Sequence, residues 1–428
     1  MLSSSLSRYF IFFICFLSSC NTNTNIDKND ILRINLIEAE KRAYMNASEV
    51  ILNLEYVVLE TSPQCLIGEV IHTSFSVSEN FILAFSNSGC LLFSRKGQFI
   101  RSIGQRGSGP QDFTDNRYSV KIDEQSDMIY LLSSYEICAY RISGQFVKKL
   151  NFLEFQKRND ITSFLCNITH WKENLFCANM DLNIGKEPYR CIIFSLDGEI
   201  VKLFPNNIFF DNGKSGKVMR STDNSNADIY LHNEQLYFRE LLCDTLFRIT
   251  NELDFVPEII FDLPGDKIPT EMRGDSDAAL RIKYRISRIY EVKKFLLLEE
   301  GEIGTKYHRS LYDKNKNQLF SFEPDPLLKG ESVMRFLDGR TSTRAFSLNG
   351  LRNDIDGGLP FDPHRSSNIQ NDNQMICIYQ SHFLKEKLTD EHFKRYSIQD
   401  QKAHEKLKKL LEDLDFEDNP VIMIATFK

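Results

Sequence analysis

Short stretches in which apolar residues alternate with polar ones recur along most of the chain, and each ends in a polar turn. Such alternation predicts strands with one buried face, and Gly or Asn in the turn tolerates the positive φ that a tight hairpin requires. The repeated unit is an aromatic residue, a Gly or Asn about four positions later, and then an apolar residue. It occurs at Phe93–Phe99, Tyr140–Phe146, Phe194–Ile200, Phe247–Leu253 and, in degraded form, Tyr312–Leu319.

The spacing of these hairpins predicts the architecture. The turn glycines Gly97, Gly144 and Gly198 are 47 and 54 residues apart. A period of roughly 40 to 50 residues with several strands per unit is typical of a β-propeller, whose blades pack around an axis because one blade cannot bury both of its faces. Five such units can be assigned, at Ile67–Ile103, Arg117–Leu150, Ile161–Phe204, Ile229–Asp262 and Tyr284–Phe322.

The two ends of the repeat region predict how the ring closes. A strand around Tyr56 and the C-terminal strand Pro420–Phe427 are left over, and we expect them to share one sheet, which completes a sixth blade and removes an open edge. The sequence therefore predicts an all-β fold, a single six-bladed β-propeller over residues 31–428.

Two segments have a helical pattern instead. Residues 383–415 include His404–Leu414, in which leucines recur at helical spacing with Lys and Glu between them. We expect this segment to be a helical insertion before the closing strand, packed on the propeller through Leu407, Leu410, Leu411 and Leu414. A shorter helix is expected at Glu38–Met45.

Residues 1–20 are not expected to belong to the fold. Arg8 precedes a nine-residue apolar stretch, which is too short for the roughly 20 residues that span a bilayer and is typical of an export signal. The sequence Leu17-Ser18-Ser19-Cys20 resembles the lipobox of bacterial lipoproteins, which implies that Cys20 is lipidated and becomes the first mature residue. The alternative is an ordinary secretory signal with a chance cysteine.

The polar residues 21–30 are interpreted as a tether between the lipid and the fold. In some bacteria an acidic run directly after the lipidated cysteine directs lipoproteins to the cell surface, but the first acidic residue here is Asp27. The sequence therefore favours an outer-membrane lipoprotein that faces the periplasm over one exposed at the surface.

Composition narrows the classes of partner and site. The net charge of −7 is unfavourable for binding a nucleic-acid backbone. Eight cysteines lie beyond residue 20, none of them in a C-x-x-C pair, and we interpret them as buried thiols, although an exported protein could form one or two disulfides. No cofactor and no metal ion are predicted.

Several stretches together resemble a family of bacterial six-bladed β-propeller lipoproteins related to NHL-type propellers. They are Leu59–Thr61, Leu66–Gly68, Gly97–Gly104, Gly107–Phe113, Asp244–Ile249, Asp356–Phe361 and Asn419–Met423. The resemblance covers about residues 31–428 and implies the propeller fold. It implies little about activity, because one fold hosts many functions.

The loop Asp354–Arg365 is the candidate ligand-binding loop. Carboxylates beside glycine and histidine could bind a hard metal ion or act as acid and base, although their spacing does not fit an EF-hand. The alternative is a structural loop in which the glycine pair makes a sharp turn and the aspartates accept backbone amides. The candidate residues are Asp354, Asp356, Phe361, Asp362, His364 and Arg365.

The sequence lacks G-x-S-x-G and H-E-x-x-H, and no catalytic residue can be assigned. It therefore favours a binding or scaffold module that is held at the membrane by its lipid and takes a protein or glycan partner, but not a nucleic acid. The alternative is a propeller-type lyase or glycan hydrolase with acidic and histidine residues at the mouth of the central channel.

Overall fold

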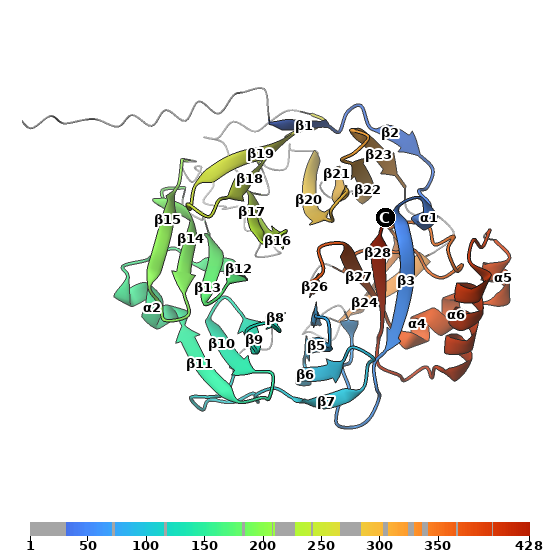
Figure 1. The fold of residues 1–428 in the computed structure, drawn as a ribbon, viewed down its shortest axis with the longest axis horizontal. Helices are drawn as coiled ribbons and strands as arrows, with labels where there is room; N and C mark the ends of the chain where they lie inside the picture. Colours follow the sequence, from blue (N-terminus) through green and yellow to red (C-terminus); the bar gives the residue numbers. More distant parts are fainter. Residues whose placement is uncertain are drawn as a thin grey trace, which may run out of the picture.

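Six β-sheets stand as blades around one axis in the computed structural model (Figure 1). The structure describes residues 31–428 except 71–72, 115–117, 182–184, 208, 210–226, 241–242, 266–283, 303–306, 324–328, 336–340, 365–366 and 396. The predicted signal peptide, the lipidated Cys20 and the tether lie outside the described residues. The predicted six-bladed propeller is confirmed.

Blades 2 and 3 are antiparallel four-stranded sheets in chain order, and blade 1 adds a fifth strand, β26 (Ser367–Ile369), which pairs in parallel with its inner strand β4. Their turn glycines Gly97, Gly144 and Gly198 have φ of +86°, +87° and +78°, so the predicted hairpin turns are present. Blade 1 contains β4 (Ser74–Val77), β5 (Phe81–Ser86), β6 (Gly89–Ser94) and β7 (Phe99–Ser102); blade 2 contains β8 (Ser119–Asp123), β9 (Met128–Leu132), β10 (Glu136–Arg141) and β11 (Phe146–Asn151); blade 3 contains β12 (Leu165–Lys172), β13 (Leu175–Met180), β14 (Tyr189–Ser195) and β15 (Ile200–Pro205).

Blades 4 and 5 each receive an extra outer strand from the N-terminal part of the chain. The strands β1 (Leu32–Asn35) and β2 (Glu40–Arg42) pair in parallel with β19 and β23, and so cover two edges. Blade 4 contains β16 (Ala227–His232), β17 (Gln235–Glu240), β18 (Thr245–Ile249) and β19 (Phe255–Asp262); blade 5 contains β20 (Tyr284–Glu291), β21 (Phe295–Glu302), β22 (Tyr307–Asp313) and β23 (Gln318–Phe322).

The helix expected at Glu38–Met45 is wrong. Residues Glu40–Arg42 are strand β2, because the free edge of β23 supplies hydrogen-bond partners that an isolated helical segment would lack. The helix here, α1 (Ala47–Val50), begins later, and the Glu49 side chain accepts the backbone N–H of Asn46 at its start.

Blade 6 closes the ring with strands from both ends of the chain. The strand β28 (Val421–Phe427) lies between β27 (Gln374–Tyr379) and β3 (Ile51–Val58), and Met423 faces Tyr56 in the register. The predicted closure is therefore confirmed. Two further strands, β24 (Lys329–Arg335) and β25 (Thr341–Ser347), pair with each other as a separate sheet.

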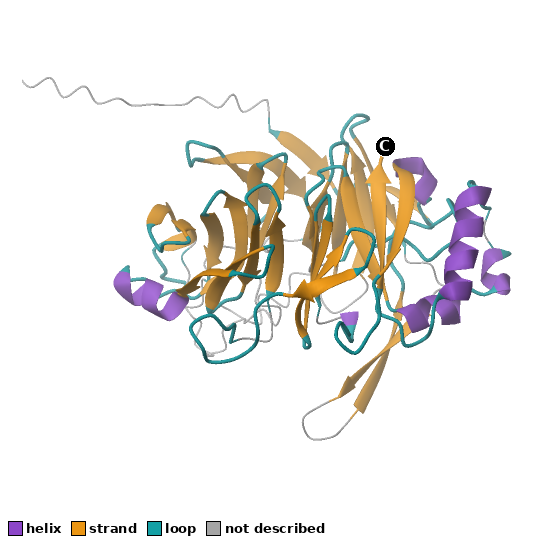
Figure 2. Ribbon diagram, turned by 60° about the horizontal axis from the view of Figure 1, so that its bottom comes forward, coloured by secondary structure: helices purple, strands orange, loops and turns teal. Residues whose placement is uncertain are grey.

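The predicted helical insertion is confirmed on the outer side of blade 6 (Figures 1 and 2). It consists of α4 (Ser381–Lys387), α5 (Asp390–Phe393) and α6 (Gln401–Asp413), whereas α2 (Phe152–Arg158) joins blades 2 and 3. Leu407 and Leu414 are buried, and Leu410 and Leu411 pack beside them. None of the described helices is long and apolar enough to cross a membrane.

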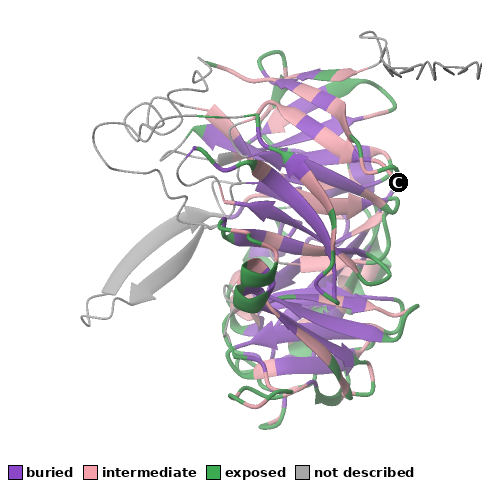
Figure 3. Cartoon of the chain, turned by 90° about the vertical axis from the view of Figure 1, so that its left-hand side faces the viewer, coloured by how far each residue is buried: buried purple, intermediate pink, exposed green. Residues whose placement is uncertain are grey.

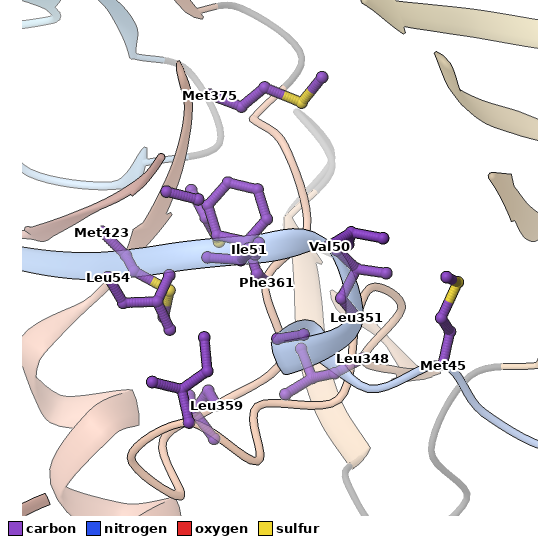
Figure 4. Packing of buried hydrophobic residues seen from close by; sticks show 14 of the residues in the cluster. Met45, Val50, Ile51, Leu54, Leu348, Leu351, Leu359, Phe361, Met375 and Met423 are labelled. Carbon is purple, nitrogen blue, oxygen red and sulfur yellow. The ribbon is translucent and has the colours of Figure 1, made fainter. Parts of the chain in front are cut away.

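Buried residues follow the strands and exposed residues gather at the turns (Figure 3). The largest apolar cluster joins blade 5, blade 6, the helical insertion and residues 348–361. Figure 4 shows this packing, in which Met45 and Ile51 from the start of the chain lie with Phe361 and Met423 from its end. This core therefore joins the two ends of the ring, and the closed ring surrounds the central channel.

Candidate functional site

A cavity of about 1250 Å³ lies at the centre of the ring. Residues from the inner strands of all six blades line it, which identifies it as the channel of the propeller. Neighbouring inner strands run in the same direction, since the hydroxyls of Ser74 and Ser76 on β4 accept the backbone N–H groups of Val120 and Ile122 on β8. The channel thus has one mouth where the inner strands begin, the N-terminal mouth, and one where they end, the C-terminal mouth.

Two inner strands are irregular where they face the cavity. The register of β12 shifts between Cys166 and Thr169, and Asn167 has φ of +48°. The register of β20 shifts between Ile286 and Arg288. Asn167 and Arg288 lie at these shifts, where a bulge can redirect a side chain, and both belong to the cavity wall.

Three charged residues form a cluster at the N-terminal mouth. The Asp228 carboxylate, at the start of β16, accepts hydrogen bonds from Arg239 at 2.9 Å and Arg288 at 3.2 Å. Arg239 is fully buried and also donates to the carbonyl of Ile286 at 2.8 Å. The Asp228 carboxylate is therefore shared between two guanidinium groups, and the side chain of Arg288 keeps 31% of its surface exposed.

Two exposed aromatic side chains stand at the same mouth. Tyr135 lies in the turn between β9 and β10, and Phe164 directly precedes β12. Their ring centroids are 5.9 Å apart in an edge-to-face arrangement, and both side chains line the cavity. Exposed fractions of 59% for Tyr135 and 40% for Phe164 are large for aromatic residues, which usually contribute to the core.

The C-terminal mouth is crossed by the segment Ser367–Gln374, which we call the axial segment. It contains β26 (Ser367–Ile369), which pairs in parallel with β4, and the turn that leads into β27. The side-chain amides of Asn368 and Gln370 donate to the carbonyls of Val120 and Ile122 on β8, both at 2.7 Å. The axial segment therefore ties the wall of blade 1 to that of blade 2.

Ionisable groups of mixed sign surround this second mouth. Burial lowers the pKa of Lys121, and the nearby Asp123 and Asp372 partly offset this effect. Burial also lowers the pKa of His170, whose ring stacks on Tyr130 with a centroid distance of 4.4 Å. The His170 Nε2 atom lies 2.8 Å from the carbonyl oxygen of Glu173, so this imidazole has a structural partner.

Two predicted site residues, Asp354 and Asp356, accept hydrogen bonds from backbone and side-chain groups of the protein itself. Asp354 accepts the N–H of Ser48 at 2.9 Å and its hydroxyl at 2.5 Å. Asp356 accepts hydrogen bonds from the backbone N–H of Gly358 at 2.8 Å, the side-chain amide of Asn353 at 2.7 Å and the hydroxyl of Tyr56 at 3.2 Å. Burial raises the pKa of Asp356. Neither aspartate lines the cavity.

The remaining predicted residues divide between the core and the cavity. Phe361 is fully buried in the main apolar cluster, and Asp362 forms a two-pronged ion pair with Arg309 at 2.7 and 2.9 Å. His364 does line the cavity, and its Nδ1 lies 2.6 Å from the Ser367 hydroxyl. Burial lowers the pKa of His364 to about 4, so the imidazole is neutral at neutral pH. Arg365 lies outside the described residues.

A metal centre has no support in the described part of the chain, where no group of three or more His, Cys, Asp or Glu side chains is placed to hold an ion. The residues that shape the N-terminal mouth were not found by sequence reasoning, because they belong to no motif. Tyr135 sits in a short polar turn, which was a weak signal of an exposed aromatic residue. Asp228 and Arg288 are 60 positions apart and meet only through the fold.

Comparison with solved structures finds one protein that shares the fold and two with weaker similarity. A protein described as exported, from Bacteroides fragilis NCTC 9343, is 16% identical with a TM-score of 0.58, covering 93% of this chain and 99% of that chain. A DUF4221 family member from Bacteroides vulgatus is 11% identical, with a TM-score of 0.43 over 64% of this chain and 86% of that one. Virginiamycin B lyase from Staphylococcus aureus is 10% identical, with a TM-score of 0.38 over 87% and 99%.

Comparison with curated proteins yields no match. A family model does match, over residues 31–426, and its description is a domain of unknown function, DUF4934. This range contains every described blade and almost all of the closing strand. The chain therefore belongs to the DUF4934 family.

Proposed function

We propose that the protein is a lipid-anchored binding module of the cell envelope that takes a protein or glycan partner at the N-terminal mouth of its channel. The observation that carries this proposal is the cavity wall itself, where Tyr135 and Phe164 stand exposed beside Asn167 and Arg288. A concave site with aromatic surface and a few convergent polar groups is the usual form of a ligand-binding site.

Binding is favoured over catalysis because the predicted carboxylates have other partners. Asp354, Asp356 and Asp362 each accept hydrogen bonds from the protein's own groups. A glycan hydrolase needs two carboxyl groups that face the substrate from opposite sides. The three aspartates of the loop do not supply such a pair, since none of them lines the cavity.

The second candidate, a lyase or hydrolase, is favoured by one observation. His364 is neutral at neutral pH, contacts Ser367 and lies in the cavity wall, so it could accept a proton from a bound substrate. Turnover of a bound ligand by the wild type, lost in His364→Gln with binding retained, would establish the enzyme.

The anchor is proposed from the lipobox-like sequence that ends at Cys20, and an outer-membrane location facing the periplasm from the lack of an early acidic run. The likeness to a protein described as exported supports this location. Metabolic labelling with a radioactive fatty acid tests it. The Cys20→Ser protein should carry no label and should no longer be found in the membrane fraction, whereas the Cys15→Ser protein should be labelled and membrane-bound like the wild type. A labelled Cys20→Ser protein would refute the anchor.

The binding role is tested by cross-linking the lipidated protein in its native envelope. A photoreactive residue in place of Ser134, in the wall of the N-terminal mouth, should capture a defined partner. The same residue in place of Lys406, on the exposed side of α6, serves as the control. Equal capture from both positions, or capture from neither, would contradict a partner at this mouth.

A further inference from the structure

The N-terminal mouth combines two kinds of surface that can each contact a ligand. One is the exposed edge-to-face pair Tyr135–Phe164, and the other is the partly exposed guanidinium of Arg288. Both border one cavity and are supplied by three different blades. Each surface constrains the chemistry of the occupant separately.

The aromatic pair favours a ligand with flat apolar faces and a polar rim. An exposed aromatic ring costs free energy in water unless something covers it. A pyranose ring carries C–H groups on its faces and hydroxyls around its edge, so its face can cover Phe164 or Tyr135 while the hydroxyls remain near polar groups. Suitable polar groups lie in the same wall, including Ser133, Ser134 and Asn167.

The arginine favours a ligand with a carboxylate. Asp228 engages one N–H group of Arg288 and is shared with Arg239, so Arg288 does not have this carboxylate to itself. Within the described ranges the other donors of Arg288 have no hydrogen-bond partner. A guanidinium with free donors in a partly desolvated wall binds a carboxylate through two parallel hydrogen bonds, which is stronger than a bond to a neutral group.

We propose that this mouth binds a glycan that contains uronic acid, with a sugar ring on Tyr135 and Phe164 and the sugar carboxylate on Arg288. The proposal rests on the binding function proposed above and specifies its ligand class. An acidic peptide would satisfy Arg288 equally well, but it has no rigid apolar face that matches the aromatic pair, so it is the less favoured occupant.

The test measures binding of defined probes to the mature, lipidated protein in detergent micelles by calorimetry. The probes are tetramers of galacturonic acid and of mannuronic acid, their neutral counterparts made of galactose and of mannose, and a tetraglutamate peptide. We expect at least one uronate tetramer to bind at least tenfold more tightly than its neutral counterpart and than the peptide. Equal or tighter binding of the neutral sugar or of the peptide would overturn the proposal, as would no binding of either uronate.

Variants separate the two contacts. Tyr135→Ala and Phe164→Ala should each weaken uronate binding about tenfold, because a stacking surface is lost. Arg288→Gln should remove the preference for the acidic over the neutral tetramer, while retaining weak binding to both. Phe416→Ala is the matched control, since Phe416 is 52% exposed and lies outside the cavity, and it should bind as the wild type does.

Each variant is first compared with the wild type by thermal unfolding. Tyr135→Leu, Phe164→Leu and Arg288→Met, which keep much of the side-chain volume but remove the ring or the charge, replace any variant that fails to fold. Unchanged uronate binding in all of the cavity variants overturns the proposed contacts. If uronates do not bind but cross-linking at Ser134 still captures a partner, the ligand class is wrong and the binding function stands. If both experiments fail, the proposed function is wrong as well.

Discussion

The backbone N–H of Asn233 donates a hydrogen bond of 3.0 Å to the carboxylate of Asp372, although the two residues belong to different blades of the ring. Asn233 follows the inner strand of blade 4, and Asp372 lies in the turn of the axial segment. With the bonds of Asn368 and Gln370 to blade 2, this contact makes the axial segment a link between blades that do not neighbour one another. Rigidity near the axis therefore depends on a few side-chain amides.

We predict that Asn368→Ala destabilises the protein by about 2 kcal/mol. Asn368 donates to the Val120 carbonyl at 2.7 Å and accepts the Ser76 hydroxyl at 2.6 Å, and a buried polar group left without its partner costs roughly 1–3 kcal/mol. Urea unfolding measures the change. Asn371→Ser, in the exposed turn of the same segment, keeps a side-chain oxygen near the backbone N–H of Asn373 and is the control, which should change the free energy of unfolding by less than about 0.5 kcal/mol. Equal effects of the two substitutions would show that the axial segment does not carry this stability.

The contact between the ends of the ring makes Gly97 sensitive to substitution. A Cβ atom at Gly97 would lie 2.1 Å from the Val58 carbonyl oxygen of β3, which is backbone and has little room to move. Gly97→Ala should therefore lower stability through both its φ of +86° and this clash, by more than about 3 kcal/mol in total.

Gly68→Ala isolates the clash. Gly68 has a similar φ of +80°, but a Cβ atom there would meet nothing within 4 Å, so only the backbone cost of roughly 1–2 kcal/mol applies. Thermal and urea unfolding of the two variants should therefore differ clearly. A Gly97 variant no less stable than the Gly68 variant would mean that blade 1 and strand β3 separate easily.

Much of the fold could be predicted from the sequence because propeller hairpins are local structures. The turns at Gly97, Gly144 and Gly198 depend on residues within a few positions of each other, and the leucines of α6 have a clear helical period. The strand at Glu40–Arg42 could not be predicted, because its partner β23 lies about 280 positions away and determines its conformation. Tertiary pairing here overrides local propensity.

The candidate site was harder to predict for the same physical reason. A sequence shows that Asp354, Asp356, Asp362 and His364 are close in the chain, but it does not show which way their side chains point. The fold turns only His364 to the cavity, and long-range partners such as Ser48 and Arg309 engage two of the aspartates. The pair Asp228–Arg288 has no local sequence signal at all.

The two interpretations of the Asp354–Arg365 loop make opposite predictions for Asp356. All three of its hydrogen bonds reach the same oxygen, Oδ1, which an asparagine can reproduce. If the loop is structural, the free energy of unfolding of Asp356→Asn should stay within about 1 kcal/mol of the wild-type value. Asp356→Ala should lower it by about 3 kcal/mol, because the donors of Gly358, Asn353 and Tyr56 lose their acceptor. Urea unfolding distinguishes the variants. Unchanged stability in both, with loss of ligand binding in Asp356→Asn, would instead indicate a role of the carboxylate in a site.

A buried carboxyl group in blade 5 has no role in the proposed site and offers a separate test of the structure. Glu300 on β21 is buried, and the hydroxyl groups of Ser310 and Tyr284 are its hydrogen-bond partners. Burial raises the pKa of Glu300 to about 7, since the charged form loses its hydration and finds no neighbouring cation that compensates.

The raised pKa predicts a specific dependence of stability on pH. In the unfolded chain this carboxyl ionises near pH 4.5, so the stabilising effect of the neutral form is complete below that pH and is lost as the pH rises through about 7. At pH 8 the cost is at most about 3 kcal/mol, which Glu300→Gln should largely remove. Urea unfolding of the variant and the wild type at pH 5 and pH 8 measures this loss of stability. The difference between the two proteins isolates the contribution of Glu300 from that of groups such as His364, whose lowered pKa changes stability with pH in the opposite direction. The exposed Glu252→Gln, in the turn between β18 and β19, is the control and should follow the wild type at both pH values. A Glu300→Gln variant whose stability relative to the wild type is the same at pH 5 and pH 8 would mean that this carboxyl is hydrated, and that the interior of blade 5 is more open than its packing indicates.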